Sequence, residues 1–466
     1  MIKNDSIIAL ATPSGIGAIA VIRISGKNAI KICNKQFQSI KNKNKDLTEA
    51  KSHTLHFGNI VDGERIIDEV LVSLFKGPNS YTGENTVEIS CHGSVYIQQE
   101  IIQLFLKHGC RMADPGEFTL RAFLNGKLDL SQAEAVADLI ASNSAASHQV
   151  AMQQMRGGFS SEIKQLRQEL LNFASLIELE LDFSEEDVEF ADRTQFRELV
   201  EKIRFALKRL IDSFSLGNVL KNGIPVAIVG APNVGKSTLL NTLLNEERAI
   251  VSNIAGTTRD VIEDEMNING VAFRFIDTAG IRDTEDVVES IGIQKTFEKI
   301  EQAQVVLYLF DSNNALHSEE RTKEIQEEIL KIQEQFPNKK CIVIANKIDL
   351  VSEKEIREKF NFEHLVLLSA KTQQGVEQLT DLLLEMANTG ALSNNETIVT
   401  NSRHFEALSN ALEEMNNVQF GLDSDLSGDL LAIDIRQALY YLGEITGEIT
   451  NDDLLGNIFA NFCIGK

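Results

Sequence analysis

An eight-residue stretch near the centre of the chain constrains the fold more than any other feature. It reads GAPNVGKS over residues 230–237, directly after the apolar run 226–229 and before a helix expected to begin near Thr238. The glycines let the backbone wrap so that successive N–H groups face phosphate oxygens, and the helix N-terminus adds a favourable partial charge. Lys236 can reach the outer phosphates, and the Ser237 hydroxyl can ligate Mg²⁺. A strand, loop and helix in this order predict an α/β domain that binds a nucleoside triphosphate.

Three further motifs follow later apolar runs, in the order that a guanine-nucleotide site needs. They are Asp277-Thr278-Ala279-Gly280, Asn346-Lys347-Ile348-Asp349 and Ser369-Ala370-Lys371. Asp277 is expected to hold the Mg²⁺ shell through water, and Gly280 lets an N–H approach the terminal phosphate. The Asp349 carboxylate can accept hydrogen bonds from N1–H and the 2-amino group of guanine, donors that adenine lacks there. The motif from residue 369 to 371 would support the base. Together they predict a GTPase.

The segment after the phosphate loop predicts a second Mg²⁺ ligand and one antiparallel strand. It contains Gly256-Thr257-Thr258-Arg259-Asp260, in which Thr258 can complete the Mg²⁺ shell once the terminal phosphate orders this loop. The turn Asn269-Gly270 then suits a two-residue hairpin between residues 263–268 and 271–276. The remaining apolar runs are short and continuous, as in strands covered on both faces. We therefore expect a mostly parallel sheet with one antiparallel edge strand.

The residue after the Asp-Thr-Ala-Gly motif leaves the orientation of the attacking water open. Many GTPases carry glutamine there, whereas this chain has Ile281, whose side chain cannot hydrogen-bond water. Another group must therefore orient the attacking water. The candidates are a bound cation beside Asn233, Arg282, and the acidic residues Asp283, Glu285, Asp286 and Glu289.

The rest of the chain predicts an α+β domain and a helical domain interrupted by the GTPase. Short β-rich runs and one helix fill residues 1–124, whereas helical periodicity dominates residues 125–222 and resumes over 389–466. Ser131 and Glu134 have capping-box spacing. Apolar residues recur at helical steps in both helical parts: Ile163, Leu166, Leu170, Phe173 and Ile177 in the first, and Leu430, Ile433, Ile435, Leu439 and Leu442 in the second. The GTPase domain is assigned to residues 223–388.

Composition excludes several classes of protein. With 68 Asp+Glu against 45 Lys+Arg, the net charge of -23 repels polyanions, so the chain is no general nucleic-acid coat. Five dispersed cysteines support neither a disulfide framework nor a zinc site. No apolar run has the ~20 residues that a membrane helix needs, and the N-terminus has no leader pattern. We expect a cytoplasmic protein. The acidic run over 178–192 is interpreted as a solvated face.

Motifs outside the GTPase domain resemble those of the MnmE family, also called TrmE, the bacterial tRNA-modifying GTPases. The resemblance runs from end to end. The family-specific stretches cover residues 11–15 (ATPSG), 22–26 (IRISG), 77–84 (GPNSYTGE), 115–119 (PGEFT), 121–130 (RAFLNGKLDL) and 462–466 (FCIGK).

This resemblance implies a function for the whole chain. The N-terminal domain would dimerise and bind 5-formyltetrahydrofolate or a related tetrahydrofolate. The homodimer would act with the flavoprotein MnmG to place an aminomethyl or carboxymethylaminomethyl group on carbon 5 of the wobble uridine of certain tRNAs. Potassium and the approach of two GTPase domains would activate hydrolysis of GTP, and the flavin and folate would supply the uridine chemistry.

The resemblance also implies roles for individual residues. Asn233, Ser252, Ile254 and Thr257 would surround K⁺, Ser237 and Thr258 would ligate Mg²⁺, and Glu289 would orient the hydrolytic water. Folate would be bound by Arg23, Glu88, Lys127 and Lys466, with Cys463 near it as a chemical participant or a packing residue. The full set expected at GTP is Asn233, Val234, Gly235, Lys236, Ser237, Thr238, Ser252, Asn253, Ile254, Ala255, Gly256, Thr257, Thr258, Asp277, Thr278, Ala279, Gly280, Asn346, Lys347, Ile348, Asp349, Ser369, Ala370 and Lys371.

Three other functions are compatible with parts of this pattern. A ribosome-assembly GTPase would share the nucleotide motifs, but it predicts a basic RNA-binding appendage that the acidic flanks lack. A folate-dependent one-carbon transferase regulated by GTP predicts transfer without a flavoprotein. An assembly scaffold that hardly hydrolyses GTP predicts the same turnover in sodium as in potassium.

Overall fold

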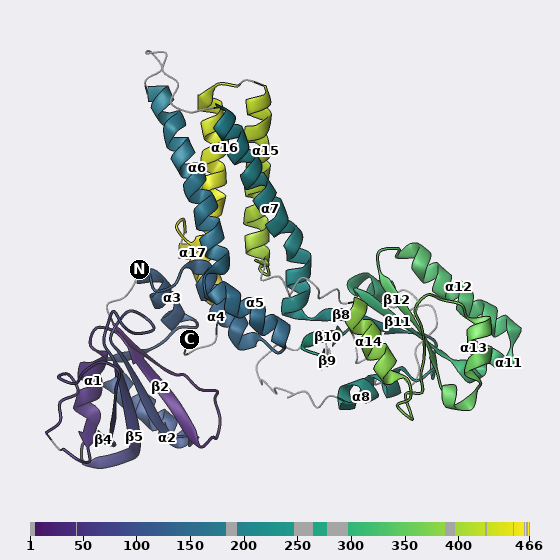
Figure 1. The fold of residues 1–466 in the computed structure, drawn as a ribbon. Helices are drawn as coiled ribbons and strands as arrows, with labels where there is room; N and C mark the ends of the chain where they lie inside the picture. Colours follow the sequence, from purple (N-terminus) through teal and green to yellow (C-terminus); the bar gives the residue numbers. More distant parts are fainter. Residues whose placement is uncertain are drawn as a thin grey trace. The chain divides into compact units, whose positions relative to one another are not determined.

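The computed structural model describes residues 5–42, 44–182, 193–246, 264–276, 297–386, 397–424, 426–450, 452–460, 462 and 465 (Figure 1). The chain divides into two compact units. The first comprises Met1–Ile140, Gln154–Leu207 and Glu406–Lys466, and the second comprises Ala141–Gln153 and Lys208–Phe405. The domain boundaries at 124, 222 and 388 stay predictions. Residues 141–153 group with the second unit.

The first unit contains a mixed sheet over its N-terminal part. Within the described residues the strand order is β3-β4-β5-β6-β2-β1-β7, antiparallel except for the parallel pair β1–β7. The strands are β1 (Ser6–Leu10), β2 (Ile19–Ser25), β3 (Phe37–Ser39), β4 (Thr54–Asp62), β5 (Arg65–Phe75), β6 (Thr86–His92) and β7 (Cys110–Met112). Helices α1 (Ala29–Gln36) and α2 (Val95–Lys107) bury residues such as Ile30 and Phe105 in the same core as the sheet. This is the α+β fold that the sequence predicts.

Helices from both ends of the chain pack together in the first unit. They are α3 (Glu117–Leu124), α4 (Leu130–Ala141), α6 (Gly158–Asp182), α16 (Gly428–Thr446), α17 (Asp452–Ala460), and the parts of α7 (Arg193–Asn222) and α15 (Ser402–Asp423) that belong to this unit. α6 and α16 lie side by side (Figure 1), and Arg167 Nε of α6 donates to the Leu439 carbonyl of α16. Phe173 stacks on Phe196 with ring centroids 4.1 Å apart. The two helical parts are therefore packed on each other.

One detail of the helical prediction is wrong, and the structure adds which residues of α16 are buried. Helix α4 begins at Leu130, so its capping box is formed by Asp129 and Gln132 and not by Ser131 and Glu134. Asp129 Oδ1 accepts from the Gln132 N–H, and Gln132 Oε1 accepts from the Asp129 N–H, both at 3.0 Å. In α16 the side chains of Leu430 and Ile433 are exposed. The buried stripe there runs through Leu431, Ile435, Ala438, Leu439 and Leu442.

The second unit is built on a sheet that is covered on both faces. Its order is β13-β12-β11-β8-β10-β9, parallel except for the edge hairpin β9–β10, as predicted. The strands are β8 (Ile224–Val229), β9 (Asp264–Ile268), β10 (Val271–Phe275), β11 (Val305–Asp311), β12 (Lys340–Asn346) and β13 (Leu365–Leu367). Asn269 and Gly270 both have positive φ, 48° and 85°, which a two-residue hairpin of the primed type requires.

Two hydrophobic cores lie on the two faces of this sheet. One contains residues of α8 (Lys236–Glu246) and α14 (Val376–Met386), and the other contains residues of α12 (Glu319–Gln335) and α13 (Glu353–Lys359), with α11 (Ser312–His317) beside them. Helix α5 (Ala145–Met155) meets the hairpin, because the Ala146 N–H donates to the Gly270 carbonyl. Among the described residues, no helix combines the length and apolar character needed to cross a membrane.

Candidate nucleotide-binding site

The phosphate loop runs from the end of β8 into α8, as predicted. Gly230 has φ +142°, and a Cβ there would lie 2.1 Å from the Leu309 carbonyl oxygen. Gly235 has φ +103°, and a Cβ would lie 2.3 Å from Asn346 Nδ2. These glycines are therefore required both by backbone conformation and by neighbouring atoms. Asn233 also lies in the left-handed region, at φ +60°, with its side chain exposed.

Lys236 begins helix α8 and closes back over the loop. Its Nζ donates to the carbonyl oxygens of Gly230 at 2.7 Å and Ala231 at 2.9 Å. Burial lowers the pKa of Lys236 from its ordinary value, and the charge of Lys299 lowers it further. A half-buried ammonium beside backbone N–H groups makes the loop suited to an anion. Ser237 follows in the first turn of the helix and is half-buried, and Thr238 is exposed.

Asn346, at the end of β12, joins the phosphate loop to the last motif. Its Nδ2 donates to the Val234 carbonyl at 2.8 Å, and its Oδ1 accepts from the Ala370 N–H at 3.0 Å. The side chain is 2% exposed. Three segments that are distant in sequence therefore meet through one amide, which explains why the predicted motif needs asparagine here.

Lys347 makes a second link to the loop. It lies in the left-handed region, with φ +65°, and its Nζ donates to the Asn233 carbonyl at 3.1 Å and to Asp311 at 2.7 Å. Asp311 in turn accepts from the N–H groups of Asn313 and Asn314 and so caps α11. Sequence reasoning missed Asp311. Asp311 is the polar residue at the end of a buried strand, and only that position in the sequence could have indicated a role at the site.

The residues expected at the base lie just beyond this junction. Asp349 is exposed in the turn after β12, whereas Ile348 is buried. Ser369 is fully buried, its Oγ accepts from the Thr372 N–H, and Lys371 beside it is exposed. Outside the described residues lie the other predicted contacts: Ser252, Asn253, Ile254, Ala255, Gly256, Thr257, Thr258, Asp277, Thr278, Ala279, Gly280 and Glu289.

A second cluster in the first unit contains two of the predicted folate residues. Arg23 of β2 and Glu88 of β6 form an ion pair at 2.8 Å. The Arg23 guanidinium lies 5.4 Å from the centroid of the Tyr81 ring and 5.7 Å from that of Phe118. Lys127 lies beside the loop that carries Tyr81, because a Cβ on Gly83 would lie 3.3 Å from Lys127 Cγ. Sequence reasoning missed Tyr81 and Phe118 as site residues, although both stand in its family-specific stretches.

The C-terminal motif lies against the same N-terminal part. A Cβ on Gly465 would lie 2.2 Å from the Leu10 carbonyl oxygen, at the end of β1, and a Cβ on Gly116 would lie 2.9 Å from Phe462 Cβ. Residues on both sides of Cys463 therefore contact the N-terminal domain. Cys463 and Lys466 themselves lie outside the described residues.

The phosphate loop and the guanine motif meet at the carboxyl edge of a mostly parallel sheet. This arrangement defines the chain as a P-loop GTPase. The model of the MnmE helical domain matches residues 130–463, and that of the GTP-binding protein TrmE N-terminus matches residues 6–127. The tRNA modification GTPase MnmE of Flavobacterium psychrophilum is 69% identical over all of both chains, and that of Bacteroides thetaiotaomicron is 55% identical over all of both. The chain belongs to the MnmE family of tRNA modification GTPases.

Solved structures of other GTPases also match part of the chain. Aquifex aeolicus Era bound to GDP.AlF4⁻ is 31% identical, covers 41% of this chain and 66% of its own, and has a TM-score of 0.27. The G domain of the T. maritima FeoB iron transporter is 25% identical, covers 35% of this chain and 99% of its own, and has a TM-score of 0.26. From its family, this chain is a GTP hydrolase that acts in tRNA modification.

Proposed function

We propose that this chain uses GTP hydrolysis to drive a conformational cycle while it modifies the wobble uridine of tRNA at carbon 5. The observation that carries the nucleotide part is the Asn346 side chain, which ties the phosphate loop to the guanine motif and to Ala370. In the cycle two GTPase domains approach, Thr258 and Glu289 engage the nucleotide, and the domains separate after phosphate is lost.

The loop residues suit a triphosphate with its cations. Ser237 in the first turn of α8 fits Mg²⁺, which is held by few protein ligands and keeps several waters. The exposed Asn233 amide fits K⁺, which we assign to it together with Ser252, Ile254 and Thr257. The two cations would neutralise charge that develops on the phosphates. Lys236 holds the outer phosphates, and the Glu289 carboxylate accepts a hydrogen bond from the attacking water and orients it.

The cluster around Arg23 suits a tetrahydrofolate. A guanidinium and a carboxylate beside the exposed Tyr81 ring, with the buried Phe118 ring behind the guanidinium, match a flat heteroaromatic ligand that has polar edges. Arg23, Glu88, Lys127 and Lys466 would hold 5-formyltetrahydrofolate or a relative, which would supply a one-carbon unit. We place Cys463 near this ligand, since its neighbour Gly465 lies against the end of β1.

The partners follow from the same proposal. The chain would form a homodimer through its N-terminal domain and would act in the cytoplasm with the flavoprotein MnmG, whose flavin contributes to the uridine chemistry. The product would be tRNA with an aminomethyl or carboxymethylaminomethyl group on the wobble uridine.

Mass spectrometry of tRNA nucleosides tests the proposal in cells whose only copy of the chain carries one substitution. We expect Lys236→Ala, Glu289→Ala and Cys463→Ser each to remove the carbon-5 group. Lys354→Ala is the control, because this lysine is 85% exposed on α13. Purified chain should hydrolyse GTP faster in KCl than in NaCl. Intact modification in both Glu289→Ala and Cys463→Ser would refute their roles, and equal turnover in the two salts would refute the K⁺ site.

A further inference from the structure

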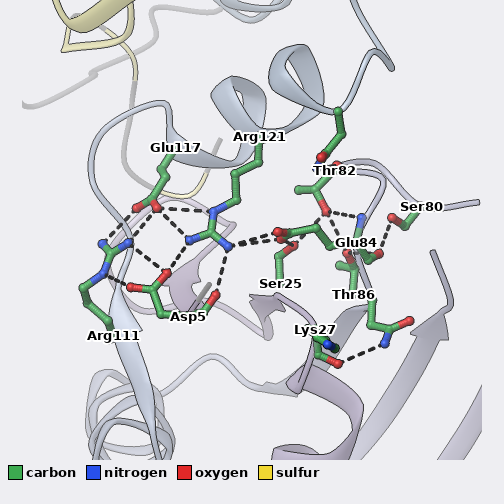
Figure 2. A network of polar contacts seen from close by, with 12 residues as sticks. Asp5, Ser25, Lys27, Ser80, Thr82, Glu84, Thr86, Arg111, Glu117 and Arg121 are labelled. Carbon is green, nitrogen blue, oxygen red and sulfur yellow. Dashed lines mark hydrogen bonds and ion pairs between the residues drawn. The ribbon is translucent and has the colours of Figure 1, made fainter. Parts of the chain in front are cut away.

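A cluster of charges surrounds a buried arginine in the first unit, where Asp5, β2, β7, the loop 76–85 and α3 supply its members (Figure 2). At its centre is Arg121 of α3, whose side chain is 2% exposed. Its guanidinium donates to Asp5 Oδ1 at 2.8 Å, to Glu117 Oε1 at 2.9 Å and to Glu84 Oε2 at 3.1 Å. A guanidinium so far from water is stable only when it is fully paired. The nucleotide chemistry uses none of these residues.

A second guanidinium completes the pairing of the carboxylates. Arg111 donates to Glu117 at 2.7 Å and to Asp5 at 2.8 Å. Burial opposes ionisation of Glu117, but hydrogen bonds from Arg111, the Asp114 N–H and Arg121 outweigh it, so the pKa of Glu117 lies below its ordinary value. Glu117 is therefore held as a carboxylate, oriented by two guanidinium groups.

Glu84 extends this cluster to the loop that carries Tyr81. Its Oε2 accepts from Ser25 Oγ at 2.8 Å, and the hydroxyls of Ser25 and Thr82 lie 2.7 Å apart. Asn125 Nδ2, just after α3, donates to the Thr82 carbonyl at 2.7 Å. Ser25 and Thr82 are fully buried. The loop is thus tied to β2 on one side and to the end of α3 on the other.

The same elements carry the residues around Arg23. Side chains two positions apart on a strand share a face, so Ser25 lies beside Arg23 on β2. The register pairs Arg23 with Glu88 and Ser25 with Thr86. Thr82 adjoins Tyr81 in the loop, and Glu117 adjoins Phe118 in α3. The Tyr81 hydroxyl also lies 2.8 Å from Thr119 Oγ1 of α3.

We propose that Arg121, Glu84, Ser25 and Thr82 form a positioning network, which holds the Tyr81 ring and α3 in place around the Arg23 guanidinium and so preorganises the ligand site. This inference rests on the proposed folate function, because that function supplies the ligand. Groups whose rotamers are fixed by such surrounding contacts lose less conformational freedom on binding, and their affinity is higher. The four side chains act through Tyr81 and Phe118 and need no contact with the ligand.

Two readouts on the full chain separate positioning from a merely structural role. The chain has five tyrosines, so labelling with 3-fluorotyrosine gives a small set of ¹⁹F resonances, in which Tyr81→Phe identifies that of Tyr81. Calorimetry with 5-formyltetrahydrofolate gives the dissociation constant. The test variants are Glu84→Gln and Ser25→Ala, of which the second leaves no charge unpaired and so guards against misfolding. Glu100→Gln is the control, because it removes the more exposed Arg65–Glu100 ion pair of the same unit.

We expect both test variants to shift or broaden the Tyr81 resonance and to weaken binding by about tenfold, with the control unchanged in both. An unchanged Tyr81 resonance, or unchanged affinity despite a changed resonance, would overturn the proposal. If the unsubstituted chain does not bind 5-formyltetrahydrofolate, the folate function fails. The Tyr81 resonance then decides alone whether the network positions the loop.

Discussion

Arg121 carries its charge among three carboxylates with almost no access to water, so removing the guanidinium takes one cation from each of them. Arg111 remains beside Asp5 and Glu117, and Glu84 loses its ion pair with Arg121. We expect Arg121→Met to lower the free energy of local unfolding of β1 and α3 by about 3–5 kcal/mol. Amide hydrogen exchange of these elements measures it. Arg65→Met, at a guanidinium that is 54% exposed, should cost less than about 1 kcal/mol. Equal costs would show that the Arg121 cluster is no more than a surface ion pair.

The lowered pKa of Glu117 predicts a pH dependence with a definite sign. Because the folded-state pKa lies below the unfolded value of about 4.3, Glu117 contributes stability fully above that pH, and the contribution is lost as the pH falls through the lower folded value. The difference in opening free energy between the chain and Glu117→Gln should therefore be constant from about pH 5 to 7 and shrink below about pH 4. A difference that grows in acid would contradict the pairing.

At the scale of elements, the phosphate loop depends on the close approach of its first glycine to β11. Gly230→Ala would place a methyl group 2.1 Å from the Leu309 carbonyl oxygen and would also strain φ. Gly63 also has a positive φ, but no atom lies within 4 Å of the Cβ that Gly63→Ala would add. We expect Gly63→Ala to cost only about 1 kcal/mol, and Gly230→Ala to cost more and to weaken GTP binding. Equilibrium titration with a fluorescent GTP analogue checks this, and unchanged affinity would refute the tight approach.

The sequence predicted elements best where a local pattern has one structural meaning. The buried strands of the second unit and the Asn269-Gly270 hairpin were predicted because continuous apolar runs and a primed turn leave little choice. Helix ends were harder, since Asp129 with Gln132 has the same spacing as Ser131 with Glu134. Which apolar residues of α16 are buried was not predicted, because tertiary packing selects among several apolar stripes.

The candidate sites were predictable to a similar extent. Asn346, Lys347 and the phosphate loop form a contiguous site because parallel strands bring their carboxyl ends to one edge of the sheet. Tyr81 and Phe118 were not predicted to surround Arg23, since that meeting depends on a loop and a helix from distant parts of the sequence. No local pattern encodes such a meeting.

For the whole molecule, the charge of -23 limits how the chain can hold its tRNA substrate. Long-range repulsion of phosphates predicts weak binding by this chain alone, with a dissociation constant above about 1 µM at physiological salt, and an affinity that falls as salt rises if a small basic surface supplies the contacts. We expect addition of MnmG to strengthen binding. Filter binding at two salt concentrations tests this, and tight, salt-insensitive binding by the chain alone would contradict it.

Nucleotide specificity tests most directly whether the site at the edge of the second sheet is a guanine site. Asp349→Asn replaces a carboxylate that would accept from the guanine 2-amino group with an amide that donates to the 2-oxo group of xanthine. The variant should hydrolyse GTP about 100-fold less efficiently and should recover turnover with xanthosine triphosphate, as measured by kcat/KM for both nucleotides. An unchanged preference for GTP in Asp349→Asn would contradict the assignment of the site.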